Sequence, residues 1–206
     1  MWKGLWCFMM KTIFRAMVAG LLVMAIMGCA SIKKESYLTG AQVIEALGLE
    51  PMGDAACPGY FKPTYASGIR AHMDRERAAA SLIYYLMTRD VTIDPWHILT
   101  SDEILLYHGG APMVQILLYP DGSWEEIVLG PEVDKGQVPQ KLIPANTWMG
   151  FVKKEDPHYD WGLYGVMVVP GWHIEDIRMV KGEKELAALR EKYPTAVKRG
   201  RELGLF

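Results

Sequence analysis

A histidine and a glutamate six residues apart are the two side chains with the clearest chemical potential in this sequence. They are His97 and Glu103, and the polar stretch Thr100–Asp102 lies between them. Because side chains alternate between the two faces of a strand, the even spacing predicts that both lie on the same sheet face. If that face lines a barrel interior, the imidazole and the carboxylate shift each other's pKa and can transfer protons. A surface hairpin with solvated acidic side chains fits the same pattern equally well.

Short apolar or aromatic runs, separated by turn residues, predict the strands that position this pair. The turn residues Pro120, Asp121 and Gly122 predict a tight hairpin between two of the runs. Many short strands, spaced ~8–12 residues apart, are typical of a sandwich, a jelly roll or a barrel. The predicted strands are Tyr60–Ala66, Ala79–Met87, Trp96–Leu99, Glu103–His108, Met113–Tyr119, Trp124–Leu129, Gln140–Ile143, Trp148–Val152, Trp161–Val169 and His173–Met179.

Two helices are predicted at the ends of this β-rich region. The first spans Ala41–Leu47, where Thr39 can cap the N-terminus and Gly48 can end the helix. The second spans Glu183–Tyr193, whose leucines share one face among charged residues, so we expect it to lie on the barrel wall. The sequence shows neither an internal repeat nor a second domain.

The motifs along the chain resemble the cupin superfamily, in particular an uncharacterised branch with the signature W-H-x-x-x-S-D-E, present here at residues 96–103. The general first cupin motif, H-x-H-x(3,4)-E-x(6)-G, is matched by His97, Glu103 and Gly110. Leu99 stands in place of the second histidine of that motif. The resemblance covers about residues 41–193.

This resemblance implies an all-β fold, the double-stranded β-helix or cupin jelly-roll barrel, with a short N-terminal helix and a C-terminal helix. It also implies a small-molecule ligand in a pocket at one mouth of the barrel, and a homodimer. We expect the cupin-like domain to span residues 39–195 and residues 196–206 to form a C-terminal tail.

The cupin metal site is only partly retained. The family uses three histidines and one glutamate, of which this chain keeps His97 and Glu103. In the second motif, P-x-G-x-x-H, which begins at Pro144, Met149 occupies the histidine position, as Leu99 does in the first motif. Two protein ligands hold a divalent ion poorly against water. We therefore expect no metal or other cofactor, and His97 and Glu103 are the weak candidates if a metal does bind.

Three functions are compatible with such a barrel. The first is an envelope-anchored module that binds a small polar ligand, such as a carbohydrate derivative. The second, by resemblance to the metal-free deoxysugar-nucleotide epimerases of the superfamily, is an isomerase with His97 as the base and Tyr107 or Tyr65 as the acid. The third and least favoured is a metal-dependent cupin enzyme. The expected ligand-binding residues are Tyr60, Lys62, Glu103, Gln115 and Trp148, and Lys62 could hold an anionic group.

Residues 1–28 have the layout of a secretory signal peptide. Lys11 and Arg15 form a basic region, and Ala16–Met27 form an apolar run that is too short to span a ~30 Å hydrocarbon core comfortably. We therefore expect an export signal; an uncleaved anchor is the alternative.

The tetrapeptide Ile26-Met27-Gly28-Cys29 resembles the bacterial lipobox, in which the cysteine is lipidated. The resemblance implies a lipid on Cys29 and a tether over residues 29–38. Several acyl chains on one cysteine give stable membrane anchoring. Ala30 after the cysteine implies sorting to the outer membrane. The expected location is the bacterial cell envelope, on the periplasmic side.

Composition excludes two broad classes of protein. With 206 residues of which 50% are hydrophobic, the chain can bury a core and is not globally disordered. The formal charge of −2, with no block of lysine and arginine, excludes a nucleic-acid partner. Beyond Cys29 the only cysteine is Cys57, which cannot form an internal disulfide and which we interpret as an incidental loop thiol.

Overall fold

The computed structural model describes residues 37–53, 57–72 and 75–205. The predicted signal peptide at 1–28, the lipidation site Cys29 and the tether up to residue 36 lie outside the described residues. Within the described part of the chain, no helix is both long enough and apolar enough to cross a membrane.

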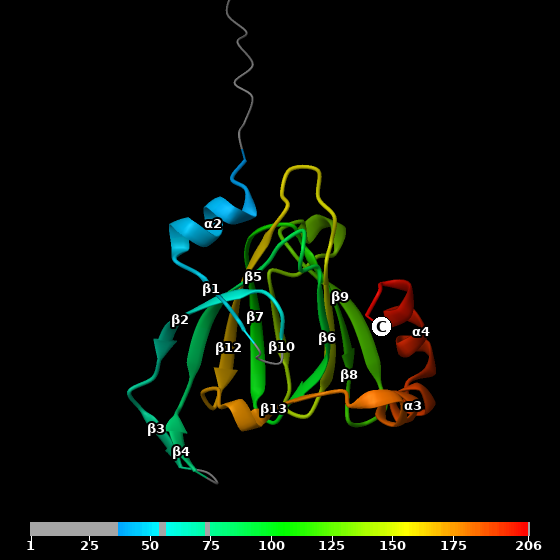
Figure 1. The fold of residues 1–206 in the computed structure, drawn as a ribbon. Helices are drawn as coiled ribbons and strands as arrows, with labels where there is room; N and C mark the ends of the chain where they lie inside the picture. Colours follow the sequence, from blue (N-terminus) through cyan, green and yellow to red (C-terminus); the bar gives the residue numbers. More distant parts are fainter. Residues whose placement is uncertain (1–36, 54–56, 73–74, 206) are drawn as a thin grey trace, which may run out of the picture. The chain divides into compact units, whose positions relative to one another are not determined.

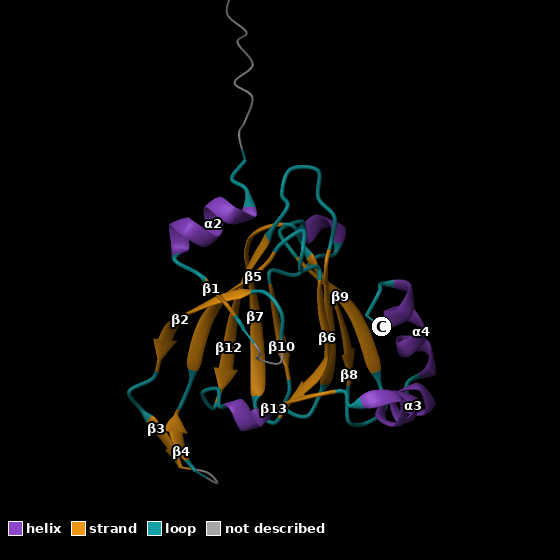
Figure 2. Cartoon of the chain, in the orientation of Figure 1, coloured by secondary structure: helices purple, strands orange, loops and turns teal. Residues whose placement is uncertain are grey.

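Two antiparallel sheets face each other and enclose the main core (Figures 1 and 2). The first sheet contains, in spatial order, β1 (Glu50–Pro51), β2 (Tyr60–Ala66), β5 (Ser81–Met87), β12 (Gly162–Val169), β7 (Asp102–Gly110) and β10 (Gln140–Ile143). The second contains β13 (Ile177–Met179), β6 (Ile93–Leu99), β11 (Trp148–Lys153), β8 (Met113–Leu118) and β9 (Trp124–Leu129). The predicted all-β jelly-roll fold with short helices is confirmed.

The strand β8 shows why this sequence forms two layers. All six of its residues are buried. Met113 and Leu117 pack in the core between the sheets, whereas Ile116 and Leu118 face the opposite way. The outer face is covered by two C-terminal helices, α3 (Gly182–Lys192) and α4 (Pro194–Glu202), shown in orange and red, respectively, in Figure 1. A strand covered on both faces needs a continuous apolar run rather than an alternating one.

The N-terminal helix α2 (Gly40–Leu47) begins and ends as predicted. The Thr39 hydroxyl accepts a hydrogen bond from the backbone N–H of Gln42, whose side chain in turn accepts one from the backbone N–H of Thr39. Gly48 ends the helix in the left-handed conformation, with φ of 61°. The helix packs against the outer face of the first sheet, next to Leu86 and Trp161.

The predicted C-terminal tail is wrong, because most of residues 196–206 belong to α4 and pack against the second sheet. Ala196 and Val197 are buried against the second sheet, together with Leu205. This segment also contains charged residues. Arg199 pairs with Glu202 and with Glu126 on β9. Because of these charged residues, the composition of the segment did not indicate a helix with a buried apolar side.

Nearly all predicted strands match an observed strand, and three have the same bounds: Tyr60–Ala66, Trp124–Leu129 and Gln140–Ile143. The run His173–Met179 is different, since its first half is the short 3₁₀ helix η2 (Ile174–Asp176) and only β13 is extended. A second 3₁₀ helix, η1, spans Val133–Lys135. Besides β1, the prediction missed the hairpin of β3 (Arg70–His72) and β4 (Glu76–Ala78) that extends beside β2 in Figure 1.

Candidate ligand-binding cavity

A cavity of about 260 Å³ lies between the two sheets. Its walls come from β2, β5, β7 and β12 of the first sheet and from β6, β11 and β13 of the second. It opens beside Tyr65 and Trp172, which are 52% and 47% exposed although both line it. This volume is slightly below the ~300–1,000 Å³ of typical small-molecule pockets, so the space suits a small ligand.

The lining is mainly apolar. Aliphatic and aromatic side chains form most of the wall, for example Leu105, Phe151 and Val168. Among the described lining residues, the acidic and histidine side chains are Asp94, Glu103 and His97, and there is no lysine or arginine. An apolar enclosure with a few polar groups is the usual composition of a ligand-binding site.

The strand β6 positions His97 in this wall, where its side chain is almost completely buried. Its Nδ1 lies 2.7 Å from the backbone carbonyl oxygen of Pro95. A carbonyl oxygen only accepts hydrogen bonds, so Nδ1 carries the proton and donates it. In the neutral ring, Nε2 then keeps a lone pair. Nε2 can therefore accept a proton or a hydrogen bond from a ligand.

Glu103 reaches the same cavity from the opposite sheet. The chain crosses between the sheets at residues 100–101, so β6 and β7 belong to different layers. The expectation that His97 and Glu103 share one sheet face is therefore wrong, although both enter the same interior. The surface-hairpin alternative is contradicted for Glu103, which is 4% exposed. Burial raises the pKa of Glu103 to about 7, an effect that nearby His97 partly opposes.

Asp94 is a second buried carboxyl group, which the sequence analysis missed. Its Oδ2 accepts a hydrogen bond from the Tyr85 hydroxyl at 3.1 Å. The same hydroxyl lies 2.7 Å from the carbonyl oxygen of Pro58. Its Oδ1 lies 3.5 Å from Nδ1 of His97 and has no hydrogen-bond partner within the described part of the chain. Burial raises the pKa of Asp94, whereas His97 lowers it. An acidic residue inside the apolar run that begins at Ile93 was the available signal.

Cys57 is a loop residue, as predicted, but its side chain is buried and lines the cavity. Its sulfur, an oxygen of Asp94 and a ring nitrogen of His97 all lie within 4.8 Å of one another. Burial is the main cause that raises the pKa of the Cys57 thiol, and the negative charge of Asp94 adds to it. The thiol is therefore held in its protonated, weakly nucleophilic form.

The residues at the cupin metal positions do not fit the family's metal. Leu99 and Met149, which stand where histidines would be, are both buried apolar side chains. The cluster of Cys57, Asp94 and His97 contains residue types that bind zinc. However, the ring nitrogen that faces Asp94 is Nδ1, whose proton is donated to the Pro95 carbonyl. We derive no chemistry through a metal.

Of the eight predicted site residues, the structure brings three to the cavity: His97, Glu103 and Tyr65. Three others lie on outer faces. Tyr60 packs beside α2, and Lys62 donates a hydrogen bond from Nζ to the carbonyl oxygen of Leu47 at 2.7 Å. Trp148 lies under the C-terminal helices, with the Arg178 guanidinium 4.6 Å from its ring centre. These three side chains do not line the cavity.

Tyr107 and Gln115 also lie outside the lining. The hydroxyl of Tyr107 donates to the carbonyl oxygen of Gly110 at 2.6 Å, and its ring packs against the core. Gln115 is completely buried, and its amide has no hydrogen-bond partner among the described residues. His108 is exposed and packs edge-on against Tyr84 on the outer face.

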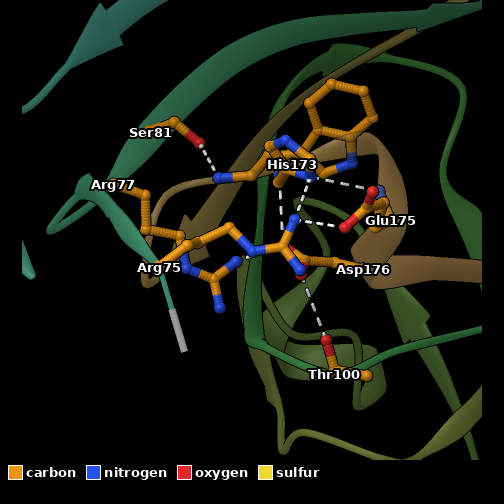
Figure 3. Close-up of polar contacts among 8 residues, drawn as sticks. Arg75, Arg77, Ser81, Thr100, His173, Glu175 and Asp176 are labelled. Carbon is orange, nitrogen blue, oxygen red and sulfur yellow. Dashed lines mark hydrogen bonds and ion pairs between the residues drawn. The ribbon is translucent and has the colours of Figure 1, made fainter. Parts of the chain in front are cut away.

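The rim of the cavity at Trp172 is held by polar contacts, which Figure 3 shows. The backbone N–H of Trp172 donates to the Ser81 hydroxyl at 2.9 Å. Farther along, Asp176 forms an ion pair with Arg77 of β4 and accepts hydrogen bonds from the Thr100 hydroxyl and the His173 backbone. The hairpin β3–β4 is thereby joined to the segment that carries Trp172.

The fold and the cavity define a jelly-roll barrel with a mainly apolar cavity between its two sheets. Residues 41–180 match the model of the family described as "Cupin superfamily (DUF985)". The chain belongs to this family of the cupin superfamily.

Individual relatives agree with this assignment. The chain is 30% identical over 144 residues to the uncharacterized protein YML079W of Saccharomyces cerevisiae, a match that covers 64% of this chain and 71% of the yeast protein. Protein SO0799 from Shewanella oneidensis has a similar structure, with a TM-score of 0.66 and 25% identity over 81% of this chain and 97% of that one. A hypothetical protein from Leishmania major shares the fold, with a TM-score of 0.68 and 21% identity over 79% and 98% of the two chains. These names state neither a ligand nor a reaction, so the function has to be argued from the cavity.

Proposed function

We propose that this protein binds a small molecule in the cavity between its sheets, with the polar end of the ligand at His97 and Glu103. One observation carries the proposal: a mainly apolar cavity of about 260 Å³ is lined by three buried titratable side chains, His97, Glu103 and Asp94. Oδ1 of Asp94 has no hydrogen-bond partner among the described residues. Buried polar groups without partners cost free energy, so a ligand that satisfies them gains affinity.

The lining also revises the expected ligand. A small polar ligand such as a carbohydrate derivative would leave many hydroxyl groups against aliphatic walls such as Leu82, Ile83 and Val166. An apolar body with one polar end is better matched to these walls. We therefore propose a compact amphipathic ligand in place of a polar one.

A pair of neighbouring substitutions on β12 tests this proposal. Val168 lines the cavity, whereas Met167, the next residue, does not. A small-molecule library is screened on the full chain for compounds that raise the thermal unfolding temperature, since a ligand of the native state stabilises it. Hits are expected to stabilise the wild type and the Met167→Phe variant but not the Val168→Phe variant. Hits that stabilise both variants equally, or the absence of hits, would contradict the proposal.

A second candidate function is metal-free acid–base catalysis of the isomerase or epimerase type. It is favoured by the hydrogen bond from Nδ1 of His97 to Pro95, which leaves Nε2 as a proton acceptor. Of the two tyrosines considered as acids, Tyr65 lines the cavity. A catalytic base predicts that His97→Ala lowers turnover of a bound hit by ~10²-fold or more, with the exposed His108→Ala as a matched control. If no hit is converted by the wild type, or if His97→Ala changes only affinity, catalysis is excluded for those compounds.

We also propose that the protein is held in the bacterial cell envelope by a lipid on Cys29, on the periplasmic side of the outer membrane. The basic region, the apolar run and the lipobox-like tetrapeptide support this proposal. Cys29→Ser should move the protein from the membrane fraction to the soluble fraction, and unchanged fractionation would contradict it. The homodimer stays a prediction, to be tested by light scattering on the purified protein.

A further inference from the structure

We propose that the polar end of the ligand is a cation that donates hydrogen bonds, such as a primary ammonium group, and that Glu103 and Asp94 select it against anions. This inference rests on the proposed function and names the class of ligand. It follows from which polar groups the cavity contains and which it lacks.

The polar end of the cavity offers hydrogen-bond acceptors. The carboxyl group of Glu103 is 4% exposed and makes no hydrogen bond with the described residues. Oδ1 of Asp94, in a side chain that is 3% exposed, is likewise without a partner there. Nε2 of His97 adds a third acceptor when the ring is neutral. An ammonium group brings three N–H donors and a positive charge, which would satisfy such a set.

The same region offers few donors. The hydroxyl of Tyr85 is already directed at Pro58 and Asp94, and the Cys57 thiol is a weak donor. At the mouth, the Ser81 hydroxyl accepts from the backbone N–H of Trp172 and keeps a single neutral O–H donor. Among the described lining residues there is no lysine or arginine. With no lysine or arginine there, and with the His97 ring neutral, a ligand carboxylate or phosphate would lose its hydration without gaining a cationic partner.

Lys62, which the sequence suggested for an anionic group, does not change this balance. Its ammonium group lies outside the cavity and donates to the carbonyl oxygen of Leu47 at 2.7 Å. The alternation of β2 explains this, since Phe61, Pro63 and Tyr65 line the cavity and Lys62 faces away. The charge of the cavity is thus set by its two carboxyl groups and by His97.

The walls specify the rest of the ligand. Next to the acceptors lie Leu99, Leu105 and the ring of Phe151, which packs edge-on against His97 at 5.5 Å between ring centres. These side chains offer no hydrogen bonds, so they favour a hydrocarbon or aromatic body. The inferred ligand class is a small primary amine on an aryl or alkyl body.

A matched series of three phenyl compounds tests the inference on the full chain. The probes are 2-phenylethylamine, 2-phenylethanol and phenylacetate, which are similar in shape but differ in charge. Titration calorimetry at pH 8 should show the amine binding about 10-fold more tightly than the alcohol, because a charged donor adds a stronger hydrogen bond. Phenylacetate should bind more weakly than the alcohol. Phenylacetate binding as tightly as the amine, or no binding by the amine, would overturn the inference.

Removal of the Glu103 charge gives the second arm of the test. Glu103→Gln should weaken amine binding by about 10-fold at pH 8 and change alcohol binding by less than about 3-fold. The control is Asp102→Asn, which alters the adjacent but exposed carboxylate. If Glu103→Gln does not fold, Asp94→Asn is the substitute, with the same expected direction. Equal amine affinity in the wild type and the folded variant would overturn the inference.

The pH dependence supplies a third readout. Amine binding by the wild type should tighten from pH 6 to pH 8, because Glu103 becomes ionised as the pH passes about 7. The other titratable groups at this end are Asp94 and His97 on β6 and the Cys57 thiol, and Glu103→Gln should reduce the pH dependence without abolishing it. Amine affinity that is flat or falls over this range contradicts the inference. If the alcohol or phenylacetate binds and Val168→Phe abolishes that binding, the proposed cavity function stands while the preference for cations fails.

Discussion

At the scale of single residues, the site depends on how His97 and Glu103 are held. The carbonyl of Pro95, two residues before His97, fixes the tautomer of the imidazole through a 2.7 Å hydrogen bond. Glu103 is placed opposite with a pKa of about 7, because burial penalises its charged form. A carboxyl group with a pKa close to neutral pH can give or take a proton at little cost. The same burial must affect the stability of the protein.

We predict that Glu103 makes the folded state less stable as the pH rises. Its pKa is about 7 in the folded protein, whereas the unfolded chain is taken to have the ordinary value of 4.5. The folded state therefore holds the proton more tightly than the unfolded state, and this stabilisation is lost as the pH rises through 7. Between pH 5 and pH 8, the free energy of unfolding of the wild type should fall by on the order of 2 kcal/mol relative to Glu103→Gln.

Urea unfolding of both proteins at the two pH values measures this difference. Asp94 titrates in both proteins, so the comparison isolates Glu103. A wild type that becomes more stable than the variant between pH 5 and pH 8 would show that the carboxyl group is not desolvated as described.

The sequence was informative about His97 and Glu103, because both occupy a motif with a defined spacing. Asp94 and Cys57 could not be assigned in the same way, since neither belongs to the motif and the loop from Cys57 meets β6 only in three dimensions. The wrongly placed aromatic residues have a different cause. Tyr60 and Trp148 are large apolar side chains, and core packing uses the same residue types as a binding pocket does.

At the scale of elements, the hairpin β3–β4 has a structural role that its sequence did not suggest. Arg77 on β4 pairs with Asp176 of η2, and their side chains are only 10% and 6% exposed. Asp176 also caps η2 by accepting from the His173 backbone at 3.0 Å. This ion pair therefore fixes the segment next to Trp172 at the cavity mouth.

We predict that Arg77→Ala destabilises the protein by about 3 kcal/mol, because it leaves a buried carboxylate without its cation. The matched control is Arg70→Ala on the same hairpin, which breaks the exposed pair with Glu76 and should cost less than about 1 kcal/mol. Chemical unfolding of both variants gives the two free energies. Equal losses in the two variants would contradict the role assigned to the buried pair.

The elements themselves were largely predictable, and the failures have local causes. The helix α2 was recognised from Thr39 and Gly48, which do cap it. The short strands β3 and β4 consist of charged residues, a histidine and alanines, so no apolar run marks them. In the segment from His173, the capping by Asp176 favours a 3₁₀ turn where the sequence pattern alone suggested extended chain.

At the scale of the whole molecule, the strand spacing predicted an all-β fold and the resemblance to the cupins implied the jelly roll. The pairing of the strands was not predicted. Which strands share a sheet depends on long-range contacts, such as β12 between β5 and β7. That pairing decides that β6 and β7 face each other across the interior. The cavity and its two carboxyl groups therefore become visible only in the folded chain.

The crystal structure of the full chain with a compound found in the stability screen is the most direct test of the proposed function. The account predicts that the compound lies between the sheets, with its apolar part against Phe151 and Val168. Its polar group should be within hydrogen-bond distance of Glu103 or of Nε2 of His97. A compound bound outside the barrel, with the space between the sheets filled by repacked side chains, would contradict the account.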